Sequence, residues 1–281
     1  MSFFRYPGGK RKLLPELDKF ILNRSGDLEY REPFFGGGSV GCRYIDGGDA
    51  AWLNDKDTGI ASLWNAVISQ PDELKALIRE FIPSIDKFDE FRSMLLSPSP
   101  GLSTGFMKLA VHQMSYSGLG MMSGGPLGGR NAKNYAGSTE IPYPIDCRWS
   151  PDHMGKKIDA LHSKFSLVCL RNGSCTSLDF ADVISDANPA FLYIDPPYYD
   201  KGNDLYCHGF AVADHIRLCE LLKKTSHEWV LSYDDVPAIH ELYSWAKIHV
   251  VGEVKYSITA TGTGTDKKST KKSELIITKG C

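Results

Sequence analysis

The stretch "LEYREPFFGGGSVGCRYI", residues 28–45, sets the fold class. A short run with strand character ends in three glycines, and a helix is expected to start near Ser39. The next stretch, "AAWLNDKDTGIASLWNAV" at residues 50–67, repeats the pattern with a strand through Trp52 and Leu53, then acids, then a helix. Alternation of strands and helices is typical of a doubly wound sheet with parallel strands. The sequence therefore predicts an α/β fold.

The alternation stops near residue 70 and returns in the second half of the chain. Residues 71–110 have helical periodicity and mixed charge, whereas residues 115–150 are rich in Gly, Ser, Asn and Pro and show no periodicity. So long an irregular stretch is typical of a binding loop. Further helices are expected near residues 152–164 and 214–225. Further strands are expected in the runs "FSLVCL", "AFLYID", "EWVLSYDD", "KIHVVGEVKYSI" and "SELIITKG".

The simplest organisation is one α/β domain formed by both ends of the chain. Residues 1–64 and 156–281 would form this domain, and residues 65–155 would be an inserted, mostly helical module. The last two strands flank "TATGTGTDKKSTKK" and predict an antiparallel hairpin at the edge of the sheet, with a basic tip. A chain of 281 residues is long enough for this arrangement.

The composition is that of an ordinary soluble globular protein, with 42% hydrophobic and 23% charged residues. The formal net charge of −2 excludes an overall basic field, so a nucleic-acid partner would need local basic patches. The seven cysteines form no CxxC pair and the eight histidines no HExxH motif, which predicts reduced thiols and no metal site. A charged N-terminal stretch and the lack of an apolar run of about 20 residues predict neither a signal peptide nor a membrane span. A cytoplasmic protein is expected.

The glycines at residues 36–38 would let a ligand approach the backbone and the free N–H groups of the helix start. The turn lacks the G-x-G-x-x-G spacing and a Walker lysine, so phosphate binding and a P-loop nucleotidase are disfavoured. Asp55 follows the next strand and could accept hydrogen bonds from ribose hydroxyls. The alternatives are a ligand-free turn between strand and helix, and a helix N-cap formed by Asn54, Asp55 or Asp57.

The string "AFLYIDPPYYDKG", residues 190–202, places one acid at the end of an apolar strand. Ligands bind at that edge of open α/β sheets, so Asp195 is a candidate binding residue. Prolines lack an N–H group, and the carbonyl of Pro196 could accept a hydrogen bond beside the Asp195 carboxylate. Two adjacent acceptors match the two N–H groups of a planar amine, and Tyr198 could stack on its ring. The alternative is a loop acid with a capping role.

Three strings, "RYPGGK", "EPFFGGGSV" and "DPPY", occur here in the order seen in the S-adenosylmethionine-dependent DNA adenine-N6 methyltransferases of the Dam type, or D12 class. The strings "LNDKD…SLWN", "GF…DH…L", "LSYDD" and "KKSELIITKG" extend the likeness over most of the chain. The chain therefore resembles this family. The resemblance implies a Rossmann-like class I methyltransferase sheet with an antiparallel terminal hairpin, and an inserted, mostly helical target-recognition module.

The resemblance also implies roles for individual residues. Three residues match the family's catalytic motif, namely Asp195, Pro196 and Tyr198. The positions that match the cofactor pocket are Tyr6, Lys10, Glu32, Phe34, Gly36, Gly38, Asp55, Asp179 and Asp195. Among them Asp55 matches the ribose-binding acid, and Asp179 falls where the family has a residue near the adenine of the cofactor. Considered without the resemblance, Lys10 is expected to be a solvated lysine, because exposed lysines are the rule.

The implied activity is methyl transfer from S-adenosylmethionine, which becomes S-adenosylhomocysteine, to the N6 amine of an adenine flipped out of double-stranded DNA. No metal is implied. An N4-cytosine DNA methyltransferase and an RNA base methyltransferase act on a similar amine and stay open as alternatives. A catalytically inactive DNA-binding protein with this fold is a further alternative, which the intact set of motif residues disfavours.

Double-stranded DNA is the implied partner, and the sequence leaves open whether a cognate restriction endonuclease is a second one. A monomeric, bacterial or phage-encoded protein is expected. Arg130 and Asn131 could contact bases, and other basic residues could contact phosphates. The candidate DNA-binding residues are Lys10, Arg11, Arg130, Asn131, Lys133, Lys267, Lys268, Lys271 and Lys272. The alternative for the last four is a solvated hairpin tip. The sequence leaves open the recognition site, the oligomeric state and any preference for hemimethylated DNA.

Overall fold

A computed structural model of the chain describes residues 4, 6, 8–24, 28–199, 209–254 and 272–280. Their centre is a seven-stranded sheet with the order β3-β2-β1-β4-β5-β7-β6. The strands are β1 (Glu29–Glu32), β2 (Ala50–Leu53), β3 (Cys169–Leu170), β4 (Ala190–Ile194), β5 (Glu228–Asp234), β6 (Lys247–Val254) and β7 (Lys272–Thr278). The first five strands in spatial order run parallel, and β7 runs antiparallel to both β5 and β6. The predicted α/β fold with an antiparallel terminal pair is confirmed.

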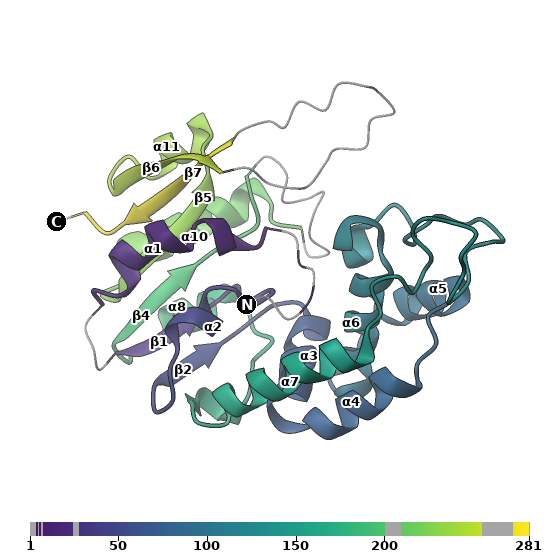
Figure 1. Cartoon of the computed structure of the whole chain (residues 1–281). Coiled ribbons are helices and arrows are strands. Elements are labelled where there is room, and N and C mark those ends of the chain that lie inside the picture. Colours follow the sequence, from purple (N-terminus) through teal and green to yellow (C-terminus); the bar gives the residue numbers. More distant parts are fainter. Residues whose placement is uncertain are drawn as a thin grey trace.

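Helices cover the sheet and form a second group beside it (Figure 1). The sheet is accompanied by α1 (Leu14–Ile21), α2 (Gly41–Tyr44), α8 (Phe180–Ser185), α10 (Val212–Lys224) and α11 (Pro237–Leu242). The group beside it contains α3 (Thr58–Ser69), α4 (Pro71–Glu80), α5 (Ile85–Met94), α6 (Leu102–Met114) and α7 (Pro151–Phe165). Short 3-10 turns are η1 (Lys10–Lys12), η2 (Tyr116–Gly118), η3 (Gly120–Met122) and η4 (Arg171–Gly173).

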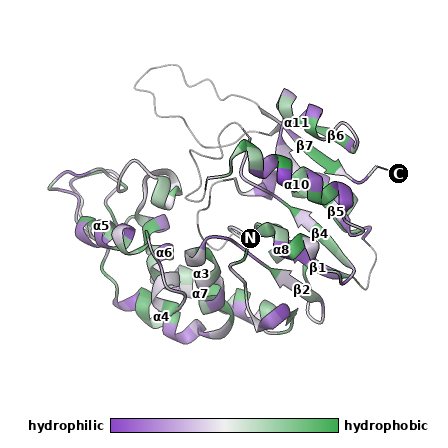
Figure 2. Cartoon of the chain, turned by 180° about the vertical axis from the view of Figure 1, so that it is seen from behind, coloured by the Kyte–Doolittle hydropathy of each residue, from purple (hydrophilic) through white to green (hydrophobic). Residues whose placement is uncertain are grey.

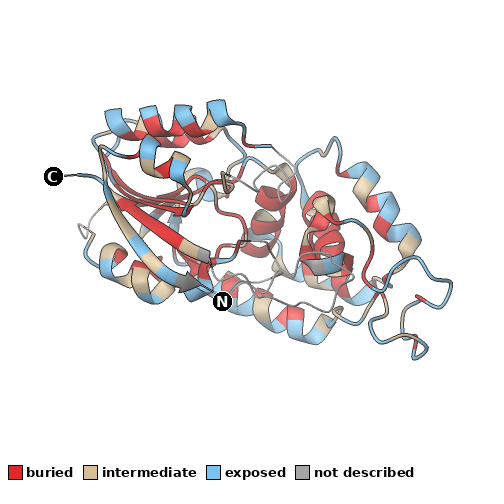
Figure 3. Ribbon diagram, turned by 90° about the horizontal axis from the view of Figure 1, so that it is seen from above, coloured by how far each residue is buried: buried red, intermediate tan, exposed pale blue. Residues whose placement is uncertain are grey.

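The two faces of the sheet pack into two different apolar clusters. On β4, Phe191 and Tyr193 belong to the larger cluster, which continues into the helical group through residues such as Trp64 of α3. The alternate residues Leu192 and Ile194 belong to the second cluster, below α10. A parallel strand covered on both faces has this continuous apolar character, which explains the run "AFLYI". Figure 3 shows the central strands buried, whereas an edge strand of the sheet and the outer sides of the helices are exposed.

The helical group is held together by close backbone contact between α3 and α6. A Cβ atom on Gly105 of α6 would lie 2.7 Å from backbone atoms of Ser62 on α3, so only glycine fits there. The amphipathic α4 buries Leu74 and Ile78 and exposes most of its charged residues, and Figure 2 shows this mixture of polar and apolar residues along the helices. Within the described ranges, no helix is both long and apolar enough to cross a membrane.

Two local predictions differ from the structure. The helix expected near Ser39 begins at Gly41 and has only four residues. The strand expected over "FSLVCL" is reduced to Cys169–Leu170, because Phe165 forms the last turn of α7. Phe165 shares the helical spacing of Ile158 and Leu161 and is buried with them, so the helical period outweighs the local strand propensity. The division of the chain into one domain of residues 1–64 and 156–281 and a module of residues 65–155 stays a prediction. Both of its boundaries fall inside helices, at residue 65 in α3 and at residue 155 in α7.

Candidate active site

A pocket lies at the carboxyl ends of the parallel strands, between the sheet and the helical group. Its empty space is about 1140 Å³, open solvent included. The sheet contributes the residues that follow β1, β2 and β4, and α6 contributes Lys108 and His112 from the other side. Ligands bind at this edge of α/β sheets. The residues that line it and were predicted for the cofactor are Tyr6, Glu32, Phe34, Gly36, Asp55 and Asp195.

The glycine turn after β1 is packed tightly against α3. Gly36 and Gly38 both have positive φ, at +46° and +64°. A Cβ atom on Gly38 would lie 2.4 Å from the ring of Trp64, which is closer than any side chain tolerates. The indole Nε1 of Trp64 donates a hydrogen bond to the Gly36 carbonyl over 2.9 Å. The turn therefore needs glycine for both its backbone conformation and its close packing.

Asp55 is joined to this turn and is not the helix cap. Its Oδ2 accepts a hydrogen bond from the Gly36 N–H over 2.7 Å, and its Oδ1 accepts one from the Asp57 N–H over 2.9 Å. The cap of α3 is Asp57, whose Oδ1 accepts hydrogen bonds from the N–H groups of Gly59 and Ile60. Burial and the nearby Asp57 charge raise the pKa of Asp55 to about 7. The capping alternative for Asp55 is thus wrong, and its carboxyl faces the pocket.

Asp57 also forms a buried ion pair across the pocket wall. Its Oδ2 accepts from the Nζ of Lys108, a residue of α6 that is 3% exposed. Both residues line the pocket. The pair therefore ties the helical group to the strand end that carries Asp55.

Glu32 is a second buried acid on the pocket wall. It accepts a hydrogen bond from the Tyr30 hydroxyl over 2.8 Å. Burial raises its pKa well above the ordinary value, and the nearby charge of Asp195 adds to this effect. A buried carboxyl group is costly to ionise unless a positive charge lies beside it. The pocket therefore favours a ligand that carries positive charge.

An aromatic cluster forms another part of the pocket wall. The ring of Phe34 stacks on that of Phe180 at 5.4 Å between centroids and meets the edge of Phe210 at 5.7 Å. Asp179 itself caps α8, and its carboxylate pairs with Lys56 and Arg217. Asp179, which was predicted for the cofactor site, does not line the pocket, whereas its neighbour Phe180 does.

Asp195 is held on one of its two carboxylate oxygens. Its Oδ1 accepts from the Nζ of Lys10 over 2.8 Å and from the Oγ of Ser232 over 2.9 Å. Burial raises the pKa of Asp195, although the Lys10 charge opposes this. In the described part of the chain, neither the Oδ2 of Asp195 nor the carbonyl of Pro196 accepts a hydrogen bond. Two neighbouring acceptors are thus available to a ligand.

Lys10 and Tyr198 complete the surroundings of Asp195. Lys10 is 2% exposed, which rules out the solvated alternative. Its Nζ lies 3.0 Å from the Tyr198 hydroxyl and 4.5 Å from the centre of the Tyr198 ring. The Tyr198 hydroxyl in turn donates to the Oε1 of Glu274 over 2.7 Å. The ring of Tyr6 lies nearby, 5.7 Å from that of His112.

Four described candidates for DNA binding are exposed and do not line the pocket, namely Arg11, Arg130, Asn131 and Lys133, whereas the fifth, Lys10, is buried beside Asp195. Arg11 is exposed on η1. Arg130 forms a forked ion pair with Asp89, at 2.7 and 2.8 Å, and Lys133 pairs with Glu140 at 2.8 Å. Asn131 accepts a hydrogen bond from the N–H of Lys133. Lys267, Lys268 and Lys271 lie outside the described residues, as does the side chain of Lys272.

Several residues of the site were not predicted from the sequence. They are Ser232, Glu274, Lys108, Phe180 and Phe210. The strings "LSYDD" and "KKSELIITKG" do place polar residues inside apolar strands, which was the available signal for Ser232 and Glu274. Among the residues that the structure describes, no cluster of His, Cys, Asp and Glu could hold a metal ion.

Comparison with known proteins places these residues in a sequence family. A family model described as D12 class N6 adenine-specific DNA methyltransferase matches residues 6–105 and 139–257, which is most of the chain. The matched ranges contain the glycine turn, Asp55 and Asp195. No curated protein matches the sequence.

Proposed function

Because the chain belongs to the D12 class of N6 adenine-specific DNA methyltransferases, we propose that it transfers a methyl group from S-adenosylmethionine to an adenine flipped out of double-stranded DNA. The family resemblance and the methyltransferase-like α/β fold predicted from the motifs are confirmed. The observation that carries the proposal is the pair of available acceptors, the Oδ2 of Asp195 and the carbonyl of Pro196.

The amine of adenine needs help because its lone pair is delocalised into the ring. Hydrogen bonds from its two N–H groups to Asp195 and to the Pro196 carbonyl would favour a tetrahedral nitrogen with a localised lone pair. The raised pKa of Asp195 makes its carboxylate a better acceptor for the proton that the amine must release. These effects are positioning and electrostatics, and they require no covalent intermediate on the protein.

The pocket walls fit the proposed cofactor. When bound, S-adenosylmethionine would supply a methyl group activated by a positively charged sulfonium. Glu32 and Asp55 are buried carboxyl groups whose ionised forms a cation would stabilise. The rings of Phe34, Phe180 and Phe210 offer apolar faces to a purine. Tyr6, Lys10, Gly36 and Gly38 would shape the rest of this site.

The target base would enter beside Tyr198. Flipping a base out of the duplex costs a few kcal/mol, and stacking on an aromatic ring offsets roughly 1–3 kcal/mol of it. We propose residues 65–155 as the target-recognition module, since α6 brings Lys108 and His112 to the same pocket. Arg11, Arg130, Asn131, Lys133 and the lysines at 267, 268, 271 and 272 are proposed DNA contacts. A cytoplasmic, bacterial or phage origin, a monomeric state and a restriction endonuclease partner stay predictions.

The test is methyl transfer from labelled S-adenosylmethionine to unmethylated genomic DNA, with the product nucleosides separated by mass. N6-methyladenine is the expected product, and the Asp195→Asn protein serves as the inactive control. N4-methylcytosine would keep the amine chemistry and contradict the adenine target. Transfer only to RNA, or no transfer by a protein that binds the cofactor, would contradict the proposed DNA substrate.

A further inference from the structure

One face of the strands β5 and β7 carries three polar side chains in a row. In the antiparallel pair, Asp234 of β5 lies directly opposite Glu274 of β7. Ser232 lies two residues before Asp234 and therefore projects from the same face. Ser232 is fully buried, Glu274 is 2% exposed and Asp234 is 5% exposed. Because polar groups that are buried this deeply require hydrogen-bond partners, the contacts of the three side chains show which part of the protein they stabilise.

Each member of the row holds a different point of the loop 195–199. The Ser232 hydroxyl donates to the Oδ1 of Asp195 over 2.9 Å. The Oδ1 of Asp234 accepts from the N–H of Tyr199 over 3.0 Å, and the Oε1 of Glu274 accepts from the hydroxyl of Tyr198 over 2.7 Å. The prolines between these points have no N–H to donate, so the loop cannot be fixed by a strand-like ladder.

The contact with Glu274 also sets the direction of the neighbouring hydrogen bonds. A phenol has one proton, and a carboxylate oxygen can only accept, so the Tyr198 hydroxyl donates to Glu274. The Tyr198 oxygen is then an acceptor for the ammonium of Lys10, at 3.0 Å. Lys10 in turn donates to the Oδ1 of Asp195, at 2.8 Å. The Oδ2 of Asp195 has no partner in the described part of the chain and stays available to a ligand.

We propose that Glu274 is a positioning residue for the methyl-transfer reaction. It fixes the ring and the hydroxyl of Tyr198, and through Lys10 it fixes the carboxylate of Asp195. This inference rests on the proposed function, since Tyr198 and Asp195 are the groups that would touch the target base. It adds the strand β7 to the elements that build the active site.

The test is a double-mutant cycle on kcat that combines Glu274→Ala with Tyr198→Phe. Loss of a hydrogen bond to a charged group predicts a decrease of kcat by about 10- to 100-fold for each single variant. If Glu274 acts through the Tyr198 hydroxyl, the double variant is no slower than the slower single variant. The KM for S-adenosylmethionine should stay within about threefold of the wild-type value, because Glu274 does not line the cofactor pocket.

Two further variants separate positioning from simple structural support. Glu274→Gln keeps an oxygen that can accept from Tyr198, so it should retain most of the wild-type kcat. Glu274→Asp keeps the charge but withdraws the acceptor, so it should lower kcat in the wild-type background and have no further effect in Tyr198→Phe. This second cycle decides the matter if Glu274→Ala does not fold. Glu241→Gln, an exposed acid on α11, is the matched control with unchanged kcat.

The outcomes distinguish this inference from the proposed function. If the wild type is active and the decreases in kcat of the two single variants multiply in the double variant, the role of Glu274 is contradicted and the proposed function stands. Full activity of Glu274→Ala would do the same. A wild type without methyl transfer to DNA would contradict both the proposed function and the inference that rests on it.

Discussion

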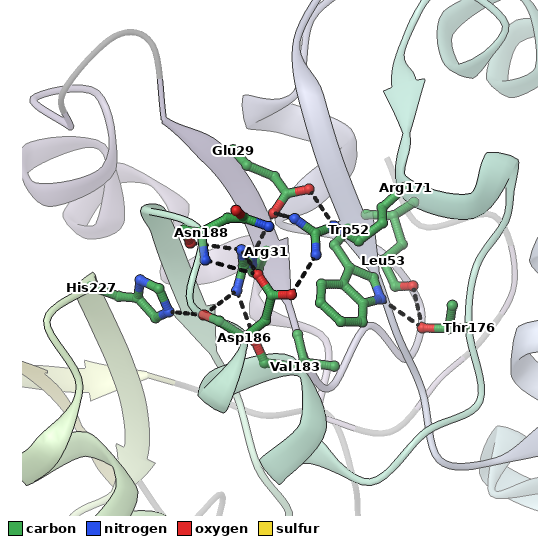
Figure 4. A network of polar contacts seen from close by, with 10 residues as sticks. All are labelled: Glu29, Arg31, Trp52, Leu53, Arg171, Thr176, Val183, Asp186, Asn188 and His227. Carbon is green, nitrogen blue, oxygen red and sulfur yellow. Dashed lines mark hydrogen bonds and ion pairs between the residues drawn. The ribbon is translucent and has the colours of Figure 1, made fainter.

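Two buried groups of charged residues lie in this sheet, and they are built in opposite ways. The first surrounds Arg31 of β1 (Figure 4). Arg31 is fully buried and forms ion pairs with Glu29 at 2.6 Å and Asp186 at 2.7 Å. Arg171 pairs with the same two acids, both at 2.8 Å. Both guanidinium groups also lie over the Trp52 ring, 5.3 Å from its centre for Arg31 and 4.5 Å for Arg171. Every charge in this group therefore has several partners.

The second group surrounds Asp195 at the carboxyl ends of the strands. Here one ammonium, that of Lys10, serves the carboxylate, and one carboxylate oxygen has no partner among the described residues. Burial acts to raise the pKa of both Asp186 and Asp195. At Asp186 the Asn188 N–H and the two arginines outweigh burial, and the pKa is lowered. At Asp195 burial prevails, and the pKa is raised.

We interpret the first group as structural and the second group as the place where a ligand is bound. A buried charge with complete pairing contributes to the native state mainly because breaking the pair is costly. A buried carboxyl with incomplete pairing has a perturbed pKa, and such groups are common at functional sites. We therefore expect mutations in the first group to lower stability and mutations in the second group to lower activity.

The largest expected effect on stability is that of Arg31→Met. Removal of the fully buried guanidinium leaves the partly buried Glu29 and Asp186 with fewer partners, and the free energy of unfolding should fall by up to about 3–5 kcal/mol. Urea unfolding followed by circular dichroism measures this loss. The Arg31→Lys variant, which keeps the charge without the fork, should lose less. A loss below about 1 kcal/mol would mean that Arg171 alone satisfies both acids.

The matching experiment in the second group is Asp195→Ala. We expect kcat to fall by at least about 100-fold, because the acceptor for the target amine is lost. The unfolding midpoint in urea should fall less than in Arg31→Met, because the Nζ of Lys10, which loses its carboxylate partner, still donates to the Gly8 carbonyl and the Tyr198 hydroxyl. Near-normal turnover by this variant would remove Asp195 from its proposed role and with it the contrast between the two groups.

Asp55 should make the binding of the cofactor depend on pH, and the effect should be of intermediate size. Its pKa of about 7 means that the fraction of ionised carboxylate rises about tenfold between pH 6 and pH 8. If the ionised form binds the cofactor, calorimetric titration should show the Kd for S-adenosylmethionine falling about tenfold over this range. The Asp55→Asn protein should show a flatter dependence. An equally steep dependence in that variant would assign the pH effect to other groups.

The raised pKa of Asp55 also makes the stability of the folded protein depend on pH. Between the ordinary pKa of 3.8 and about 7, the folded protein keeps a proton on Asp55 that the unfolded chain has lost. The folded state binds more protons in this window, so the contribution of Asp55 to stability falls as the pH rises and is constant above it.

The smallest expected effect belongs to the exposed pair of Arg130 and Asp89, which serves as a reference for both groups. Because solvent screens the pair, Arg130→Ala should change the free energy of unfolding by less than about 1 kcal/mol. If Arg130 contacts a DNA phosphate, the slope of log Kd against log salt should decrease by about 1. An unchanged slope would mean that Arg130 makes no phosphate contact.

The sequence predicted the parts of the site that depend on local pattern. The apolar run before Asp195 and the three glycines after β1 identify the two strand ends that meet at the pocket. Burial of Lys10 could not be predicted from the basic string around it, because its partner Tyr198 lies 188 positions away. Glu274 lies 76 positions from Tyr198, and only the antiparallel register of β7 brings them together. Contacts of this range depend on the assembled sheet.

The order of the strands along the chain has a consequence for synthesis on the ribosome. Of the described strands, β7 is the last to be translated, yet it lies between β5 and β6. A nascent chain that stops short of residue 272 would leave the edge of β5 without a neighbour, and unpaired edges promote aggregation. It would also lack Glu274. We therefore expect that the protein cannot modify DNA before β7 has been translated and has inserted between β5 and β6.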